Sequence, residues 1–363
     1  MGIVAASTGQ YLEAGELMKQ ALVIATELGD RRVEGTLSGN LGNVYSDLGE
    51  YTMAGERYSE AIAIARELGN KQSEAQWLGC SGSLAFRCGR YREARETMES
   101  ALEMARELEA QAVLGWCVGT LGEILVDLGE YEEAEQRLDE ALSLALSVGD
   151  RVTQVWWIGV LGKLSTKRGD YSAAKRHYVE ALAIARDVGD RRSEGQWIGG
   201  LGTVASRTGD VAHADQLLRE ALQFAVEVGD PRLITDWQRV LSDVSVQRRD
   251  LDGAVAHLNE ALVVERTLEG DHALVLDACM ALLIELGDYQ GAGELLAIAD
   301  RETIDSELAR PKWEQERYEN AVAAYRAQRD DGAATPQPEM LSVGRADAVD
   351  LAIEHLVRYS NAI

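Results

Sequence analysis

The chain offers few residues that could perform catalysis or bind a metal. Its histidines are His177, His213, His257, His272 and His355, and its cysteines are Cys80, Cys88, Cys117 and Cys279. The gaps between the cysteines match neither zinc-ligand spacing nor a CxxC redox motif. No HExxH motif or phosphate-binding P-loop is present, and the glycine-rich string at 199–202 is expected inside a helix. We therefore expect no catalytic site, metal or cofactor, with cysteines as small core residues and histidines as exposed or half-buried helix residues.

The net charge of the chain limits the classes of partner that it can bind. The 363 residues include 36 Lys and Arg against 61 Asp and Glu, a formal net charge of −25. Binding to a phosphate backbone or an anionic lipid surface depends on an excess of Lys and Arg. The sequence also contains no run of about 18 apolar residues and no secretory signal peptide at its start. These features predict a cytoplasmic protein that binds neither nucleic acid nor membranes.

A short motif recurs with a period of 40 residues, which indicates an internal repeat. Gly-acid-Tyr or a variant of it begins at residues 9, 49, 89, 129, 169, 209 and 249, and an eighth copy begins at 287, two residues early. Each unit contains two helical patterns, such as 33–48 and 51–68, with apolar residues on one face. Glycines end the helices, and an Asp or Asn such as Asp30 or Asn70 is placed to cap the helix that follows.

A helical hairpin of this length cannot bury its own apolar face, so several must stack. The sequence predicts an all-α solenoid of about seven to eight helical hairpins over 1–300. It predicts a degenerate repeat or single helix in 301–329, with an amphipathic pattern at 312–327, then a linker at 330–342. A capping helix is expected in 343–363. The start of the chain aligns with the middle of a first helix, which favours excision from a larger protein over an irregular N-terminal cap.

The residues within one unit resemble the signature of the tetratricopeptide repeat: Leu41-Gly42, Tyr45, Gly49, Tyr51, Ala54, Tyr58 and Ala61. The unit is similar to the 40-residue variety of this repeat. The string GDRRSEGQWIGGLG at 189–202 is similar to bacterial arrays that form sensor or scaffold parts of STAND-class signalling ATPases, and Leu41-Gly42-Asn43 is similar to Leu-Gly-Asn repeat adaptors. The resemblance implies a right-handed superhelix that binds a protein or peptide segment, within a larger bacterial signalling or defence protein.

The resemblance also implies which residues line the concave groove, because first helices form that face in the family. The expected groove residues are Asn43, Gln76, Arg87, Trp116, Glu123, Asp127, Trp156, Lys163, Lys167, Gln196, Arg207 and Arg239. They combine an acidic step at Glu123 and Asp127 with a basic step at Lys163, Lys167 and Arg207. Basic residues beside exposed tryptophans suit a peptide that carries acidic groups. Two alternatives remain open: an unspecific polar wall, and a small-molecule sensor that holds a sugar or aromatic ring on the groove tryptophans.

One groove position is occupied by glycine in five successive units: Gly39, Gly79, Gly119, Gly159 and Gly199, followed by Arg239. A glycine inside a helix costs about 0.5–1 kcal/mol relative to alanine, so a compensating role is expected. Either a ligand backbone approaches the helix closely there, or the glycine makes room for a tryptophan of the neighbouring unit. Trp77, Trp157, Trp197 and Trp237 recur at multiples of 40 residues and are expected to pack between units, which leaves Trp116 and Trp156 as candidates for binding.

Overall fold

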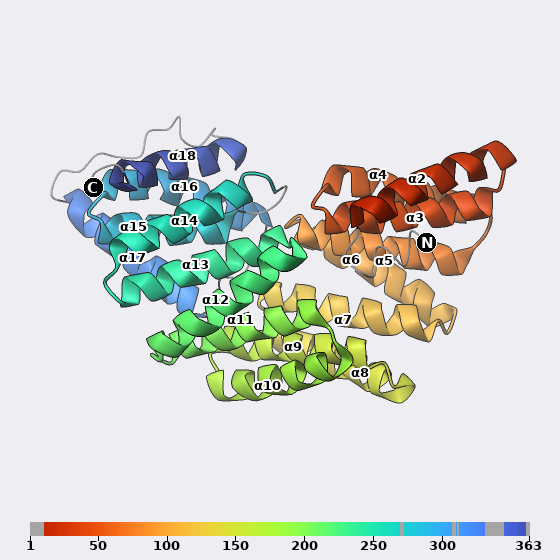
Figure 1. Ribbon diagram of the computed structural model, residues 1–363, viewed down its shortest axis with the longest axis horizontal. Helices are drawn as coiled ribbons and strands as arrows, with labels where there is room; N and C mark the ends of the chain where they lie inside the picture. Colours follow the sequence, from red (N-terminus) through yellow and green to blue (C-terminus); the bar gives the residue numbers. More distant parts are fainter. Residues whose placement is uncertain (1–10, 269–271, 307–309, 311, 331–344, 361–363) are drawn as a thin grey trace. The chain divides into compact units, whose positions relative to one another are not determined.

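The computed structural model describes residues 11–268, 272–306, 310, 312–330 and 345–360. These residues form 17 α-helices and no strand (Figure 1). The first helices of the hairpins are α3 (Arg31–Asp47), α5 (Lys71–Arg87), α7 (Gln111–Leu128), α9 (Arg151–Arg168), α11 (Arg191–Arg207), α13 (Pro231–Gln247) and α15 (Ala273–Glu285). The second helices are α2 (Tyr11–Leu28), α4 (Tyr51–Glu67), α6 (Tyr91–Glu107), α8 (Tyr131–Val148), α10 (Tyr171–Val188), α12 (Val211–Val228), α14 (Leu251–Glu265) and α16 (Tyr289–Ser306). The expected all-α solenoid of helical hairpins is confirmed. Residues 1–10, where the incomplete first helix was expected, lie outside the described residues.

The helix boundaries follow the predicted capping residues. The Asp30 side chain accepts a hydrogen bond from the backbone N–H of Val33 at 3.1 Å, and Asn70 caps the next hairpin in the same way. Gly49 ends α3 in the left-handed region with φ 80°, which costs glycine little because it has no Cβ. Arg249 adopts the same conformation with φ 60°, at the position where the motif loses its glycine. The turn geometry therefore belongs to the repeat even where the sequence departs from it.

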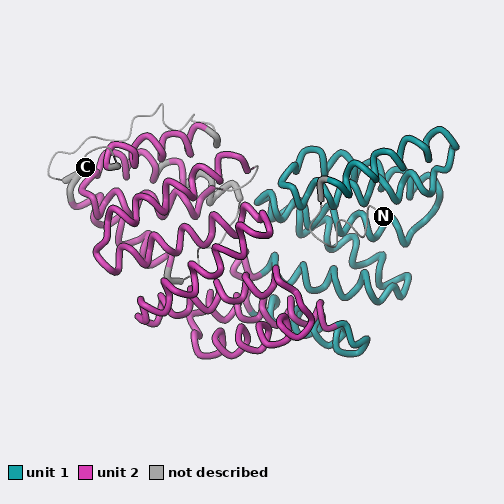
Figure 2. Tube along the Cα trace, in the orientation of Figure 1, with its two compact units in different colours: residues 1–125, 132–150 teal, residues 126–131, 151–363 magenta. Residues whose placement is uncertain are grey.

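Contacts divide the chain into two compact units within the repeat array (Figure 2). Unit 1 contains residues 1–125 and 132–150, and unit 2 contains residues 126–131 and 151–363. The division falls at the end of α7, so that Asp127 belongs to unit 2 together with the helices that follow α8.

Within a hairpin, a glycine on the first helix lets the second helix approach closely. A Cβ added to Gly42 would lie 2.6 Å from the Tyr58 ring, and one added to Gly162 would lie 2.7 Å from the Tyr178 ring. Alanines of the second helices, such as Ala54 and Ala61, are completely buried beside them. Small residues on one helix facing large rings on the other give the dense packing typical of a protein core.

The helices expected at 312–327 and 345–360 are present as α17 (Lys312–Asp330) and α18 (Arg345–Ser360). Helix α18 packs against α14, α15 and α16 in unit 2, where Ala348, Ala352 and Leu356 are fully buried. His355 on this helix is only 2% exposed and contacts Glu294 at 2.9 Å, and His272 is also buried against Glu265. The expectation of exposed or half-buried histidines is wrong for these two, because each is enclosed by the end of the array and paired with a carboxylate. The segment expected to be a linker at 330–342 lies almost wholly outside the described residues.

Among the described helices, only α7 has the length and hydropathy that would allow it to cross a membrane. Its 18 residues are 61% buried inside the protein. Burial of this kind is typical of a helix that belongs to a protein core.

Candidate binding surface on the inner helices

Successive first helices lie next to one another in each unit: α3 contacts α5, and α9, α11, α13 and α15 follow one another in contact. Their half-buried and exposed residues form a surface that we call the inner face. The predicted groove residues lie on these helices and on α7. The contacts of these residues determine which of them a partner can reach.

The recurring glycines of the inner helices accommodate tryptophans from the next hairpin. A Cβ on Gly39 would lie 2.4 Å from the Trp77 ring, and one on Gly159 would lie 2.1 Å from the Trp197 ring. Gly199 is related to Trp237 in the same way, and Gly79 faces Trp116 and Cys117. Packing against a neighbouring indole thus accounts for the glycine at these four positions, without a ligand backbone. Gly119 is buried on α7.

The tryptophans differ in how much of each side chain is buried by packing between hairpins. Trp77, Trp157, Trp197 and Trp237 are buried as expected. Trp116 is half-buried, but its ring faces Gly79, so part of its surface also serves the contact between hairpins. Trp156 is half-buried too, and its ring centroid lies 5.7 Å from that of Trp197 in a tilted arrangement. Of the two tryptophans expected to bind a partner, Trp156 is the better candidate for contact with one.

The predicted basic step begins with two lysines that share one carboxylate. Lys163 and Lys167 place their Nζ atoms 3.0 and 2.8 Å from the carboxylate oxygens of Asp127. Burial by itself would raise the pKa of Asp127, but the two ammonium groups lower it to about 2. Lys167 is nearly buried, with 10% of its side chain exposed, whereas Lys163 keeps 33%. The acidic and basic steps are therefore not separate along the face: Asp127 compensates one of the two lysines.

The remaining expected groove residues fall into two groups. Arg87 lies 3.5 Å from Asp47 and above the Tyr51 ring, and the amide oxygen of Asn43 accepts a hydrogen bond from the Tyr58 hydroxyl at 2.7 Å. These side chains hold neighbouring helices together. Gln76 is exposed, and Glu123 and Gln196 are half-buried on their helices. Within unit 2, the structure brings Lys163, Lys167 and Asp127 together.

At the C-terminal end of unit 2, the inner face is in contact with α17. Arg239 pairs with Glu314, and Asp243 pairs with both Arg207 and Arg317. Arg310, just before α17, makes a two-bond ion pair with Asp277, with Nε 2.6 Å from Oδ2. Burial works to lower the pKa of the Arg239 guanidinium, but the surrounding carboxylates of Glu314, Asp236 and Asp243 raise it above its usual range. The predicted groove residue Arg239 is thus joined directly to an element beyond the regular repeats, and Arg207 is joined to it through the shared Asp243.

Sequence reasoning did not select Asp243, Asp277, Glu314 or Arg317 as site residues. Asp277 could have been found by counting, since it lies ten residues before Gly287, as Gly39 lies ten before Gly49 and Arg239 ten before Arg249. Asp243 occupies a groove position of its repeat. Glu314 and Arg317 belong to no repeat position, so nothing in the periodicity indicates them.

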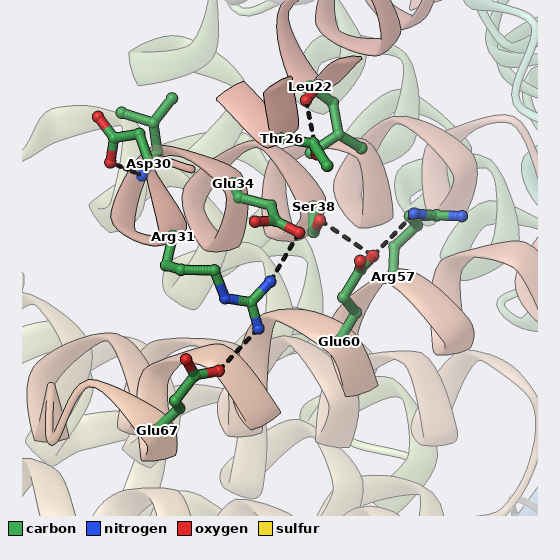
Figure 3. A network of polar contacts seen from close by, with 10 residues as sticks. Leu22, Thr26, Asp30, Arg31, Glu34, Ser38, Arg57, Glu60 and Glu67 are labelled. Carbon is green, nitrogen blue, oxygen red and sulfur yellow. Dashed lines mark hydrogen bonds and ion pairs between the residues drawn. The ribbon is translucent and has the colours of Figure 1, made fainter. Parts of the chain in front are cut away.

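Charged residues at the helix starts form a different kind of network (Figure 3). Arg31 lies between Glu34 and Glu67, 2.7 Å from a carboxylate oxygen of each, and the Ser38 hydroxyl donates to Glu60 at 3.0 Å. Arg191 repeats the first of these contacts with Glu194. The arginines of the Gly-Asp-Arg-Arg loops therefore engage carboxylates of adjacent helices, and Arg31 is still 42% exposed. Such exposed pairs contribute little to stability.

The described residues contain no group of three His, Cys, Asp or Glu side chains arranged to hold a metal ion. Burial raises the pKa of the thiols of Cys80 and Cys117 to about 12, which makes them poor nucleophiles.

Comparison with known proteins identifies the repeat. Tetratricopeptide repeat models match residues 1–67 and 73–147, and a second such model matches residues 158–192. No curated protein sequence matches the chain.

Solved structures with a similar fold are about 15% identical in sequence. The apo form of RapI has a TM-score of 0.59 at 15% identity, covering 73% of this chain and 95% of RapI. The Rap conjugation gene regulator of plasmid pLS20, in complex with the Phr* peptide, has a TM-score of 0.57 at 14% identity, covering 85% and 78% of the two chains. Aspartyl phosphate phosphatase F from Bacillus subtilis has a TM-score of 0.55 at 15% identity, covering 80% and 76%. At these identities the likeness concerns the fold.

Proposed function

We propose that this chain, which belongs to the tetratricopeptide repeat proteins, is a non-catalytic module whose inner face binds a segment of a partner protein or peptide. The binding surface is centred on α9 and α11 of unit 2. We further infer that the module serves as a sensor or scaffold in a larger bacterial signalling or defence protein, as its resemblance to signalling arrays suggests.

The observation that carries the proposal is the combination of side chains on α9. Trp156 and Lys163 are seven residues apart, so they lie on the same face of the helix two turns from each other. Both are partly exposed, and Gln196 is half-buried on the adjacent α11. A partly exposed tryptophan is typical of the few residues that dominate an interface, and the lysine and the amide beside it can supply polar contacts at the rim.

The charges of this surface favour a partner with acidic groups. Lys163 and Lys167 place two ammonium groups beside the single carboxylate of Asp127. Lys163 is the more exposed lysine, so it is the one that a carboxylate of a partner can reach. The net charge of −25 disfavours an acidic peptide in general, and the exposed part of Lys163 offers such a peptide one favourable position.

A structure with the same fold supports a peptide as the partner. The Rap regulator of plasmid pLS20 was solved with the Phr* peptide bound. The alternative function, a sensor of sugars or aromatic small molecules, needs indole faces that are open to solvent. Trp77, Trp197 and Trp237 are buried against glycines of the neighbouring hairpin, so this alternative depends mainly on Trp156.

The proposal can be tested by selecting peptides from a displayed library on the immobilised chain and measuring their affinities. Trp156→Ala and Lys163→Ala are each expected to weaken the selected peptides by about tenfold or more. Lys163 is the suitable lysine to change, because Lys167 still compensates Asp127 in that variant. The matched control is Lys175→Ala, which removes an exposed lysine from the outer helix α10.

Three outcomes would contradict the proposal: no selected peptide binds saturably, all three variants bind equally well, or only Lys175→Ala weakens binding. Saturable quenching of tryptophan fluorescence by a small metabolite, lost in Trp156→Ala, would favour the small-molecule sensor instead.

A further inference from the structure

The segment that begins with Arg310 and continues into α17 presents three charged residues to the inner face of unit 2. Glu314 and Arg317 are three residues apart and lie on one face of α17, and Arg310 precedes the helix, four residues before Glu314. Their partners are Asp277 on α15 and Arg239 and Asp243 on α13. A basic, acidic and basic series thus meets an acidic, basic and acidic series, so the two surfaces are complementary in charge.

The receiving surface departs from the repeat where α17 contacts it. Arg239 and Asp277 occupy the position that is glycine in the earlier inner helices. At Gly199 this position is filled by Trp237 of the next hairpin, but the residue that corresponds to Trp237 in the last repeat is Val275. Valine is smaller than tryptophan, and the Arg239 side chain is buried with 7% exposure and reaches Glu314. These repeats have exchanged an apolar contact within the array for a charged contact with a separate helix.

The two halves of α17 are held differently. Ala321, Val322 and Tyr325 are buried, and a Cβ on Gly293 of α16 would lie 2.6 Å from the Tyr325 ring. This second half is therefore packed as a core element. The first half packs Tyr318 against the edge of the core and also contributes charged pairs, but two of its buried polar atoms, Oε2 of Glu314 and Nη2 of Arg317, have no hydrogen-bond partner. Buried polar atoms without partners cost free energy, so the first half is the weaker part of the contact.

We propose that the inner face of α13 and α15 is a docking site for a partner segment with basic, acidic and basic residues at positions i, i+4 and i+7, the last two on a helix, and that Arg310 and the first half of α17 occupy this site within the same chain. A partner of this kind binds by displacing Arg310, Glu314 and Arg317 from Asp277, Arg239 and Asp243. The inference rests on the proposed function, and it assigns a second partner chemistry to the inner face.

The test uses the full chain and a fluorescein-labelled peptide with the sequence of residues 310–330, followed by fluorescence anisotropy. The double variant Glu314→Gln/Arg317→Gln removes the internal competitor and leaves Arg239 and Asp243 in place. It is expected to bind the peptide at least tenfold more tightly than the unaltered chain, because the docked helix reduces the fraction of chains that can bind. The matched control Glu319→Gln/Arg326→Gln changes two exposed charges of the same helix and should bind like the unaltered chain.

Charge order provides the specificity control. A peptide with the residues at 314 and 317 exchanged should bind the Glu314→Gln/Arg317→Gln chain at least tenfold more weakly than the natural sequence. Equal binding of the two peptides, equal binding by the double variant and the unaltered chain, or no binding by either chain would overturn the inference. Library-selected peptides that still require Trp156 and Lys163 would then show that the proposed function stands while this inference fails.

Hydrogen exchange of the unaltered chain gives a second measurement, which does not depend on whether a variant folds. Amides of the first half of α17 should exchange at least tenfold faster than those in the middle of α13 and α15, because the charged contact opens without unfolding the repeats. Addition of the 310–330 peptide should increase that exchange further. Protection of 314–317 equal to that of α13 would mean that α17 is a permanent part of the array, and it would overturn the inference.

Discussion

The inner helices of the earlier hairpins and those of the last two differ at one repeated position. In α3, α9 and α11 this position is glycine, and a tryptophan from the next hairpin fills the space beside it. In α13 and α15 the position holds Arg239 and Asp277, which form ion pairs with Glu314 and Arg310. The same place in the repeat is therefore completed by the array itself in one region and by a separate segment in the other.

The difference shows how a repeat protein can separate stability from recognition. A glycine and an indole form an apolar contact within the array, so those hairpins need no charged partner at that position, although the indole N–H groups of Trp197 and Trp237 are buried without a hydrogen-bond partner. A buried charge requires an opposite charge, and the last hairpins obtain it from outside the array. A change in one side chain thus turns a packing position into a docking position.

The largest expected effect comes from removing the indole that fills the glycine position. Trp197 is 2% exposed, lies against Gly159 and stacks on Tyr178 with ring centroids 5.9 Å apart. Trp197→Ala should lower the free energy of unfolding by about 3–5 kcal/mol, whereas Val275→Ala in the last repeat should cost about 1.5 kcal/mol. Urea denaturation followed by circular dichroism measures both. Equal losses in the free energy of unfolding would show that this position contributes the same stability in the earlier hairpins and in the last one.

The glycine side of the same contact should show a smaller effect. Gly159→Ala places a Cβ 2.1 Å from the Trp197 ring, and the rigid ring must shift, at a cost of about 1–3 kcal/mol. Gly55→Ala is the control, because its nearest neighbour is a Leu84 methyl group at 3.7 Å. That substitution should stabilise the helix by about 0.5–1 kcal/mol. Thermal melting of both variants would reveal the opposite signs, and a stabilising Gly159→Ala would refute the packing role.

The charged part of the inner face should be sensitive to acid. The pKa of Asp127 is about 2 in the folded chain, below its ordinary value of 3.8, because Lys163 and Lys167 outweigh the effect of burial. A lowered pKa contributes stability above the ordinary value and loses it as the pH falls toward 2, and the contribution here is about 2 kcal/mol. The stability difference between the unaltered chain and Asp127→Asn should therefore shrink between pH 5 and pH 2. A difference that stays constant with pH would contradict the paired state of Asp127.

Much of the fold follows from local residues. Asp30 and Asn70 cap helices, and Gly49 ends one, because each acts on backbone groups within a few residues. The tryptophan series also predicted its packing role, since one contact is repeated along the chain. The candidate site was less predictable. Lys163 and Lys167 indicated a basic step, but Asp127, some forty residues earlier, compensates one of them.

The sequence by itself determined the repeat and its helix boundaries, because these depend on short-range periodicity. Only the tertiary structure decided which charges meet. Arg239 and Glu314 are 75 residues apart, and Glu314 lies outside the repeat register, so no spacing connects them. The choice of partner for a buried charge depends on which side chains the folded chain brings within hydrogen-bond distance, and that is a property of the three-dimensional packing.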